Sequence, residues 1–98
     1  MKNEERVAAM EKRLCDARRV IADANASLER LSAELDEINK LDRYYGSKEW
    51  YDDIAAYDRG EVCIPCGVLS EDEAYDVITA RRELAVRMLE IATEILKK

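Results

Sequence analysis

The sequence predicts an all-α domain in which a long N-terminal helix and a long C-terminal helix form an antiparallel hairpin. Three observations support this prediction. Helix-forming residues dominate the 98-residue chain, which contains only three Gly and one Pro. Apolar residues recur in alternating steps of three and four through the first forty or so positions. Turn and capping residues then divide the rest into a short helix and a long one. The length suits a single domain spanning residues 1–98.

The N-terminal helix is predicted over about residues 2–43. Its apolar positions form an uninterrupted heptad pattern of a and d residues, without an internal Gly or Pro. These positions are Val7, Met10, Leu14, Ala17, Ile21, Ala24, Leu28, Leu31, Leu35 and Ile38. The flanking positions are charged near the N-terminus and become small, neutral or apolar from Val20 onward. We therefore expect the two halves of this helix to have different neighbours, with Gly46 beyond its end providing the stop.

A short helix is predicted over about residues 48–58. Ser47 suits the N-cap position because its hydroxyl can accept a hydrogen bond from an amide of the first turn. Gly60 is expected to end this helix. The following segment, about residues 59–69, is rich in turn-forming residues and is predicted to be a loop.

The last helix is predicted over about residues 71–97. Ser70 opens it as an N-cap, and Glu73, three positions later, is placed to reach back to the cap amide in a capping box. Two adjoining apolar stripes cover nearly half of this helix. That is wider than one neighbouring helix requires.

The unequal lengths of the two long helices predict a homodimer. At 1.5 Å per residue they span roughly 60 and 40 Å, so the shorter helix cannot cover the longer one. Large uncovered apolar patches are rare on monomers, and a second copy would complete a bundle. The alternative is a monomer whose first helix bends and packs on itself. The candidate interface residues are Val7, Met10, Leu14, Ile78, Leu89 and Leu96.

Two short motifs carry a family resemblance. The first is Tyr44-Tyr45-Gly46-Ser47 followed by Trp50 and Asp53, and the second is Gly67-Val68-Leu69-Ser70-Glu71-Asp72 followed by Tyr75-Asp76. Both resemble the uncharacterised bacterial family catalogued as domain of unknown function 4298. The resemblance implies a long helix before the first motif and a helix after the second. It implies no activity and no catalytic residues. The segment 58–66 departs from the family pattern, being shortened and carrying Cys63-Ile64-Pro65-Cys66.

The two motifs bring aromatic and acidic residues to one end of the molecule, which is the candidate binding site. These residues are Tyr44, Tyr45, Trp50, Tyr51, Asp53, Asp72, Tyr75 and Asp76. One interpretation is a small core anchored by Trp50 that closes the end of the hairpin. The other is a recognition surface, since exposed Tyr and Trp are favoured at interfaces. The exposure of Trp50 and Tyr51 distinguishes the two.

Cys63 and Cys66 have the spacing of half a zinc site. The chain has no His, and its third cysteine, Cys15, lies on the first helix, so a structural zinc ion would need carboxylates or a second subunit. A thioredoxin-like redox role would need the first cysteine at a helix N-terminus. We favour ordinary loop thiols and expect no cofactor.

Two carboxylate pairs, Glu34 with Glu37 and Glu73 with Asp76, each lie on one helix face. All-α nucleotide pyrophosphohydrolases hold magnesium with similar pairs, which makes such an enzyme one alternative. The pairs are more widely spaced here, and no lysine-rich phosphate pocket accompanies them. The absence of His also removes the commonest general base. We therefore expect a protein without catalytic activity.

The net charge of −6 and the pI near 4.7 disfavour direct binding to nucleic acid or anionic membranes. No apolar run is long enough to span a membrane, and the N-terminus lacks a signal-peptide core, so a cytoplasmic location is expected. The sequence favours a homodimeric domain that scaffolds or binds another protein. The main alternative is an acidic, phage-type inhibitor that mimics nucleic acid and occludes the basic groove of an enzyme.

Overall fold

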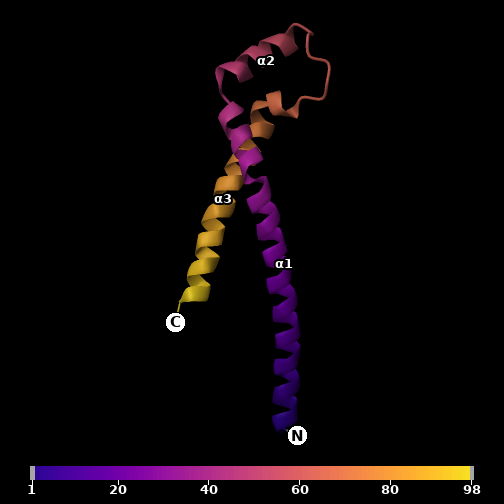
Figure 1. The fold of residues 1–98 in the computed structure, drawn as a ribbon, viewed down its shortest axis with the longest axis vertical. Coiled ribbons are helices and arrows are strands. Elements are labelled where there is room, and N and C mark those ends of the chain that lie inside the picture. The colour runs from indigo at the N-terminus through magenta and orange to yellow at the C-terminus, as the bar shows by residue number, and fades with distance from the viewer. Residues whose placement is uncertain (1, 98) are drawn as a thin grey trace. The chain divides into compact units, whose positions relative to one another are not determined.

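The computed structural model describes residues 2–97, and these are all-α as predicted (Figure 1). The helices are α1 (Lys2–Tyr44), α2 (Lys48–Asp58) and α3 (Glu71–Leu96), and a 3-10 turn, η1 (Gly67–Leu69), precedes α3. No strand occurs within residues 2–97. The prediction of a loop over 59–69 missed η1, and α3 ends one residue earlier than predicted because Lys97 has an extended backbone.

The chain folds as two compact units. The first ends at Leu35 and the second begins at Asp36. The boundary falls inside α1, since this helix continues to Tyr44. The second unit therefore contains the last turns of α1 together with α2, η1 and α3.

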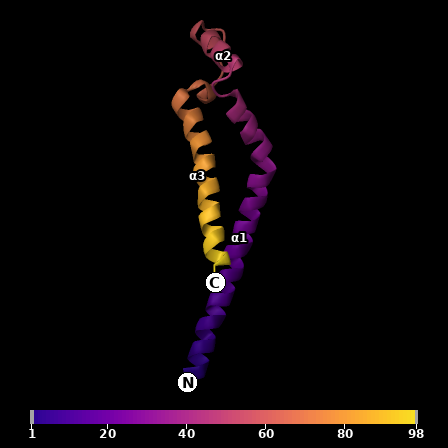
Figure 2. The same cartoon turned by 90° about the vertical axis from the view of Figure 1, so that its left-hand side faces the viewer.

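The last turns of α1 and the first half of α3 lie antiparallel in the second unit. Arg81 of α3 donates hydrogen bonds to Asn39 Oδ1 over 2.5 Å and to Asp42 Oδ2 over 3.1 Å. The second contact is also an ion pair between partly exposed groups. Figure 2 shows α2 and η1 grouped at the N-terminal end of α3. The buried core of the described residues is here, and it consists of Trp50 and Ala74.

Serine caps open α2 and α3, as the sequence predicts. Ser47 Oγ accepts a hydrogen bond from the Trp50 amide over 3.2 Å, and Ser70 Oγ accepts one from the Glu73 amide over 3.4 Å. Each bond satisfies one of the amides that a helix leaves without a partner at its start. Gly46, just before the first cap, has a φ of +77° that L-residues rarely adopt.

The predicted capping box at Ser70 is wrong in its second half. The Ser70 amide donates to the carbonyl oxygen of Gly67 over 2.9 Å, which closes η1. It is therefore not available to the Glu73 carboxylate, which instead lies against the α-carbon of Gly67. A side chain at position 67 would meet that carboxylate, so the glycine makes this close approach possible.

Candidate binding site at the α2–η1 end

Trp50 is the anchor of the second unit. Its side chain is only 5% exposed, and its indole Nε1–H donates a hydrogen bond to the Val68 carbonyl oxygen over 3.0 Å. Its ring lies 4.8 Å from that of Tyr45 in a tilted arrangement and 5.1 Å from that of Tyr51 in an edge-to-face arrangement, centroid to centroid. The structure therefore places Trp50 in the small core and not on a recognition surface.

The tyrosines around Trp50 face solvent to a large extent. Tyr51 is 62% exposed, so it covers one side of the indole while leaving most of its own surface open. Tyr57 and Tyr75 are also exposed, and Tyr44 and Tyr45 are partly buried. This end thus combines a buried tryptophan with a rim of exposed tyrosines. Trp50 thus fits the core interpretation, and no contact of the exposed tyrosines tests the recognition-surface interpretation.

Tyr44 and Asp53 join the end of α1 to α2. The Tyr44 hydroxyl donates a hydrogen bond to Asp53 Oδ2 over 2.5 Å. Desolvation of the phenol, followed by this hydrogen bond and the negative charges of Asp53 and Glu49, raises the pKa of Tyr44 from 10.0 to about 12. The phenol is thus held in its protonated, donating form across the physiological pH range.

Acidic residues of the second motif influence Tyr45, which belongs to the first motif. Desolvation raises the pKa of this phenol, and the nearby charges of Glu71 and Asp72 at the start of α3 raise it further. Residues more than twenty-five positions apart in the sequence therefore share one electrostatic environment. Asp53, Asp72 and Asp76 are all exposed, so their charges face solvent.

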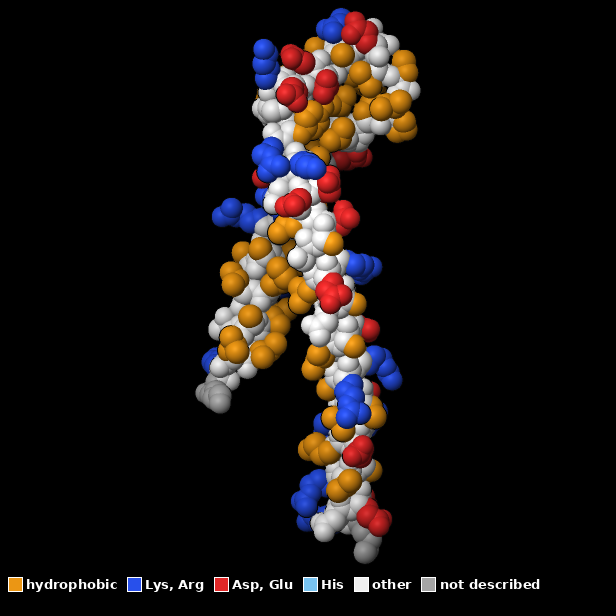
Figure 3. Space-filling model, in the orientation of Figure 1, with side chains coloured by type: hydrophobic (Ala, Val, Ile, Leu, Met, Phe, Trp, Pro, Cys, Tyr) orange, Lys and Arg blue, Asp and Glu red, His pale blue; other side chains and the backbone are white. Residues whose placement is uncertain are grey.

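Negative charge is concentrated at this end. Residues 49–76 contain nine Asp and Glu side chains and a single basic residue, Arg59, giving a net charge of −8, which exceeds the −6 of the whole chain. Arg59 is already paired with Glu61 through two contacts of 3.0 and 3.1 Å. Figure 3 shows the acidic side chains beside the hydrophobic cluster of α2 and η1.

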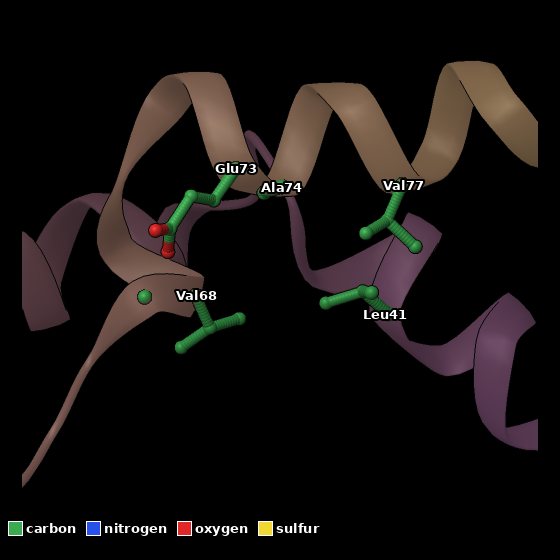
Figure 4. A pocket seen from close by; sticks show the side chains of 6 residues that line it. Leu41, Val68, Glu73, Ala74 and Val77 are labelled. Atoms are coloured by element: carbon green, nitrogen blue, oxygen red, sulfur yellow. The ribbon is translucent and has the colours of Figure 1, made fainter.

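A small apolar groove lies between the end of α1, η1 and the first turns of α3 (Figure 4). Its volume is about 310 Å³, and its lining residues are Leu41, Gly67, Val68, Glu73, Ala74 and Val77. Apart from the Glu73 carboxylate, the lining is apolar. The sequence did not predict this groove, because Glu73 was expected to reach back to the cap amide and the other lining residues come from separate segments. The Gly-Val-Leu sequence just before a cap was the available signal.

The candidate metal ligands are not gathered into a cluster. Cys63 and Cys66 are not joined by a disulfide, and their thiols donate to the carbonyl oxygens of Gly60 and Ile64, at 3.5 and 3.0 Å. Among residues 2–97, no group of three or more His, Cys, Asp or Glu side chains is arranged to hold a metal ion. Within the same range, every helix is too short or too polar to cross a membrane.

The candidate dimer residues lie on the surface of the chain. Val7, Met10, Leu14, Leu89 and Leu96 are exposed, and Ile78 is partly buried. In the first unit, the a and d positions form one stripe along α1, here called the α1 seam. It comprises Val7, Met10, Leu14, Ala17, Ile21, Ala24, Leu28, Leu31 and Leu35. Its six most exposed large side chains are between 41% and 61% accessible.

Comparisons with known proteins identify a family and nothing more specific. A search of curated proteins gave no match, and neither did a search of solved structures. A family model described as Domain of unknown function (DUF4298) matches residues 7–91, which include both motifs and most of the three helices. The chain therefore belongs to the DUF4298 family.

Proposed function

We propose that this protein is a non-catalytic protein–protein interaction domain that acts as a homodimer, with the α1 seam as its self-association surface. The observation that carries the proposal is the exposure of the seam. Six large apolar side chains in heptad positions face solvent along a helix with no other apolar cover in its unit. Helices with this pattern are stabilised by packing the stripe against another helix.

The small size of the buried core supports the same proposal. Among the described residues only two are buried, so the chain alone has little core. Association supplies the missing burial.

Sedimentation equilibrium of the full chain tests this proposal with a matched pair of variants. Leu28 is a half-exposed seam residue, and Ala26, two positions away, is an exposed residue on the opposite face of the heptad. Leu28→Glu and Ala26→Glu change the net charge equally, but only the first buries a carboxylate in the dimer. The wild type and Ala26→Glu should sediment as dimers at micromolar concentration, and Leu28→Glu should dissociate at least about tenfold more readily.

A wild-type protein that sediments as a monomer throughout this range would contradict the proposal. So would a Leu28→Glu variant that remains as tightly dimeric as Ala26→Glu. Far-UV circular dichroism of both variants at matched concentration shows whether a loss of mass reflects dissociation or loss of the helix itself.

A second candidate function is an acidic inhibitor that occupies the basic groove of a nucleic-acid enzyme. The net charge of −8 over residues 49–76, beside exposed Tyr51 and Tyr75, favours it. Such a partner would be captured from the host at low salt and released as screening increases. The partner should be lost when Asp52, Asp53, Asp72 and Asp76 are replaced by Asn. It should be retained when four exposed α1 carboxylates away from the inferred charge pair, Glu4, Glu5, Glu29 and Glu37, are replaced by Gln.

A further inference from the structure

We infer that the second copy packs on the α1 seam antiparallel, with Ile21 of each copy facing Ala24 of the other. This inference rests on the proposed self-association and adds to it the direction and register of the two helices. Its basis is the distribution of large and small residues along the seam, together with the charges beside it. Both lie within the first unit, where α1 is a continuous helix.

The seam places its small residues at only one kind of heptad position. Its a positions are all large, whereas Ala17 and Ala24 occupy consecutive d positions at its centre. In an antiparallel pair, each layer joins an a residue of one helix to a d residue of the other. Ile21 then faces Ala24, and Leu28 faces Ala17, so a large side chain fills the space beside each alanine. The layers on either side pair Leu14 with Leu31 and Leu35 with Met10.

A parallel, in-register pair cannot place a large side chain opposite each alanine. Its layers join a to a and d to d, so Ala17 would face Ala17 and Ala24 would face Ala24. A layer of two isoleucines at position 21 would separate these two thin layers. Closely packed interiors do not tolerate such gaps, and voids of this size cost stability in proportion to their volume.

The flanking charges also favour the antiparallel arrangement. There, g positions face g positions, and Arg13 of one helix faces Glu34 of the other, twice in the symmetric dimer. The e positions pair Glu11 with Ser32 and Arg18 with Asn25, so no like charges meet. In the parallel arrangement, the attraction of Arg6 for Glu11 is offset on both sides by the repulsion between Arg13 and Arg18, so the charges give no net advantage.

The charges and the length of overlap together favour one antiparallel register. Shifting the partner by one heptad so that Leu28 faces Ala24 loses the pairing of Arg13 with Glu34 and shortens the overlap.

A shift in the other direction is disfavoured by repulsion. It would pair Ile21 with Ala17 and Leu14 with Ala24, which also joins large residues to small ones. That register, however, places Arg18 directly opposite Arg18 at the two-fold axis and shortens the overlap. The unshifted register avoids the repulsion and uses a longer part of the seam.

Disulfide exchange between single-cysteine full-length chains tests the arrangement. The background carries Cys15→Ser, Cys63→Ser and Cys66→Ser. In it, Ile21→Cys and Ala24→Cys proteins are mixed in equal amounts in a glutathione buffer. A disulfide needs β-carbons about 3.8 Å apart, which only the a–d layer provides for this pair. The mixed disulfide should exceed each homodisulfide by at least about tenfold. A second mixture, of Ile21→Cys and Ala17→Cys in the same background, tests the shifted antiparallel register.

Spin-label distances provide a readout that leaves the seam intact. Glu5→Cys and Ala26→Cys place labels on the outer face of α1 in the same background. Measured along the helix axis, the inferred arrangement separates the two position-5 labels by about 50 Å and the two position-26 labels by about 10 Å. In a parallel, in-register dimer neither pair is offset along the axis, so the two pairs would give equal distances.

The possible outcomes distinguish a failure of the antiparallel arrangement from a failure of the proposed self-association. A dimer in which homodisulfides dominate, or in which both label pairs are close, overturns the antiparallel arrangement and leaves self-association standing. Dominant pairing of Ile21→Cys with Ala17→Cys overturns the register. A background protein that is monomeric at all concentrations, like a monomeric wild type, overturns the arrangement together with the proposed function.

Discussion

The indole Nε1–H of Trp50 donates a hydrogen bond to the carbonyl oxygen of Val68 over 3.0 Å. This bond joins α2 to η1 across eighteen positions of sequence and satisfies the one polar atom of a side chain that is otherwise buried. An indole buried without a partner would lose the favourable hydration of its N–H. The bond therefore fixes which face of α2 packs on η1.

Replacing Trp50 should separate the contributions of this bond and of packing. Trp50→Phe removes the donor and leaves the Val68 carbonyl without its partner, so we expect a loss of about 1–2 kcal/mol in the free energy of unfolding. Trp50→Ala also removes the ring and should cost about 3–5 kcal/mol. Urea unfolding followed by circular dichroism measures both, with the exposed Tyr51→Phe as a control expected to change stability by less than about 0.5 kcal/mol.

Arg81 should stabilise the pairing of α1 with α3 in the second unit. Its guanidinium contacts both Asn39 and Asp42, a geometry that a lysine cannot reproduce. Because the ion pair is partly exposed, we expect Arg81→Ala to cost about 1–2 kcal/mol and Arg81→Lys about half as much. Urea unfolding is again the measurement. The adjacent, exposed Arg82→Ala should be nearly neutral, and an equal effect of both alanine variants would contradict this role.

Tyr44 should make stability fall at alkaline pH. Its pKa is about 12 in the folded chain against 10.0 as the ordinary value, so unfolding favours release of the proton. The stabilisation is fully present below pH 10 and is lost as the pH rises towards 12. Tyr44→Phe has no proton to release, so the advantage of the wild type over this variant should shrink between about pH 10 and about pH 12. Urea midpoints across that range test this, with the exposed Tyr75→Phe as the control variant.

Replacing Gly46 should lower stability because of its backbone conformation and not because of a steric clash. Its φ is +77°, and a β-carbon built there meets nothing within 4 Å. Gly46→Ala should therefore cost about 1–2 kcal/mol through left-handed strain. Asn tolerates this conformation better, so Gly46→Asn should lose less. Equal stability of all three proteins in thermal unfolding would contradict this assignment.

Local chemistry predicted the helices and their starts. Ser47 and Ser70 are caps because their hydroxyls act on amides only three positions away, and the heptads of α1 depend on spacing within one helix. The same local reasoning failed at Glu73. The amide that it was expected to reach is already bonded within η1, a turn that short-range patterns did not reveal.

Long-range features of the candidate site could not be predicted. The sequence offered a core anchored by Trp50 as one of two interpretations, but the choice between them depends on contacts with Val68, eighteen positions away. The groove beside Glu73 likewise needs Leu41 and Val77 from two helices. Pattern analysis identifies which residues are apolar. It does not identify which ones a distant segment covers.

The buried position of the single tryptophan gives the chain an internal optical reporter. Trp50 belongs to the second unit, and residues 1–43 contain no aromatic side chain. Indole fluorescence therefore follows the melting of the second unit, while far-ultraviolet dichroism reports the helices of both units, including residues 2–35 of α1 in the first. Coincident curves from the two signals would show that both units unfold in a single cooperative step, and separated curves would resolve two steps.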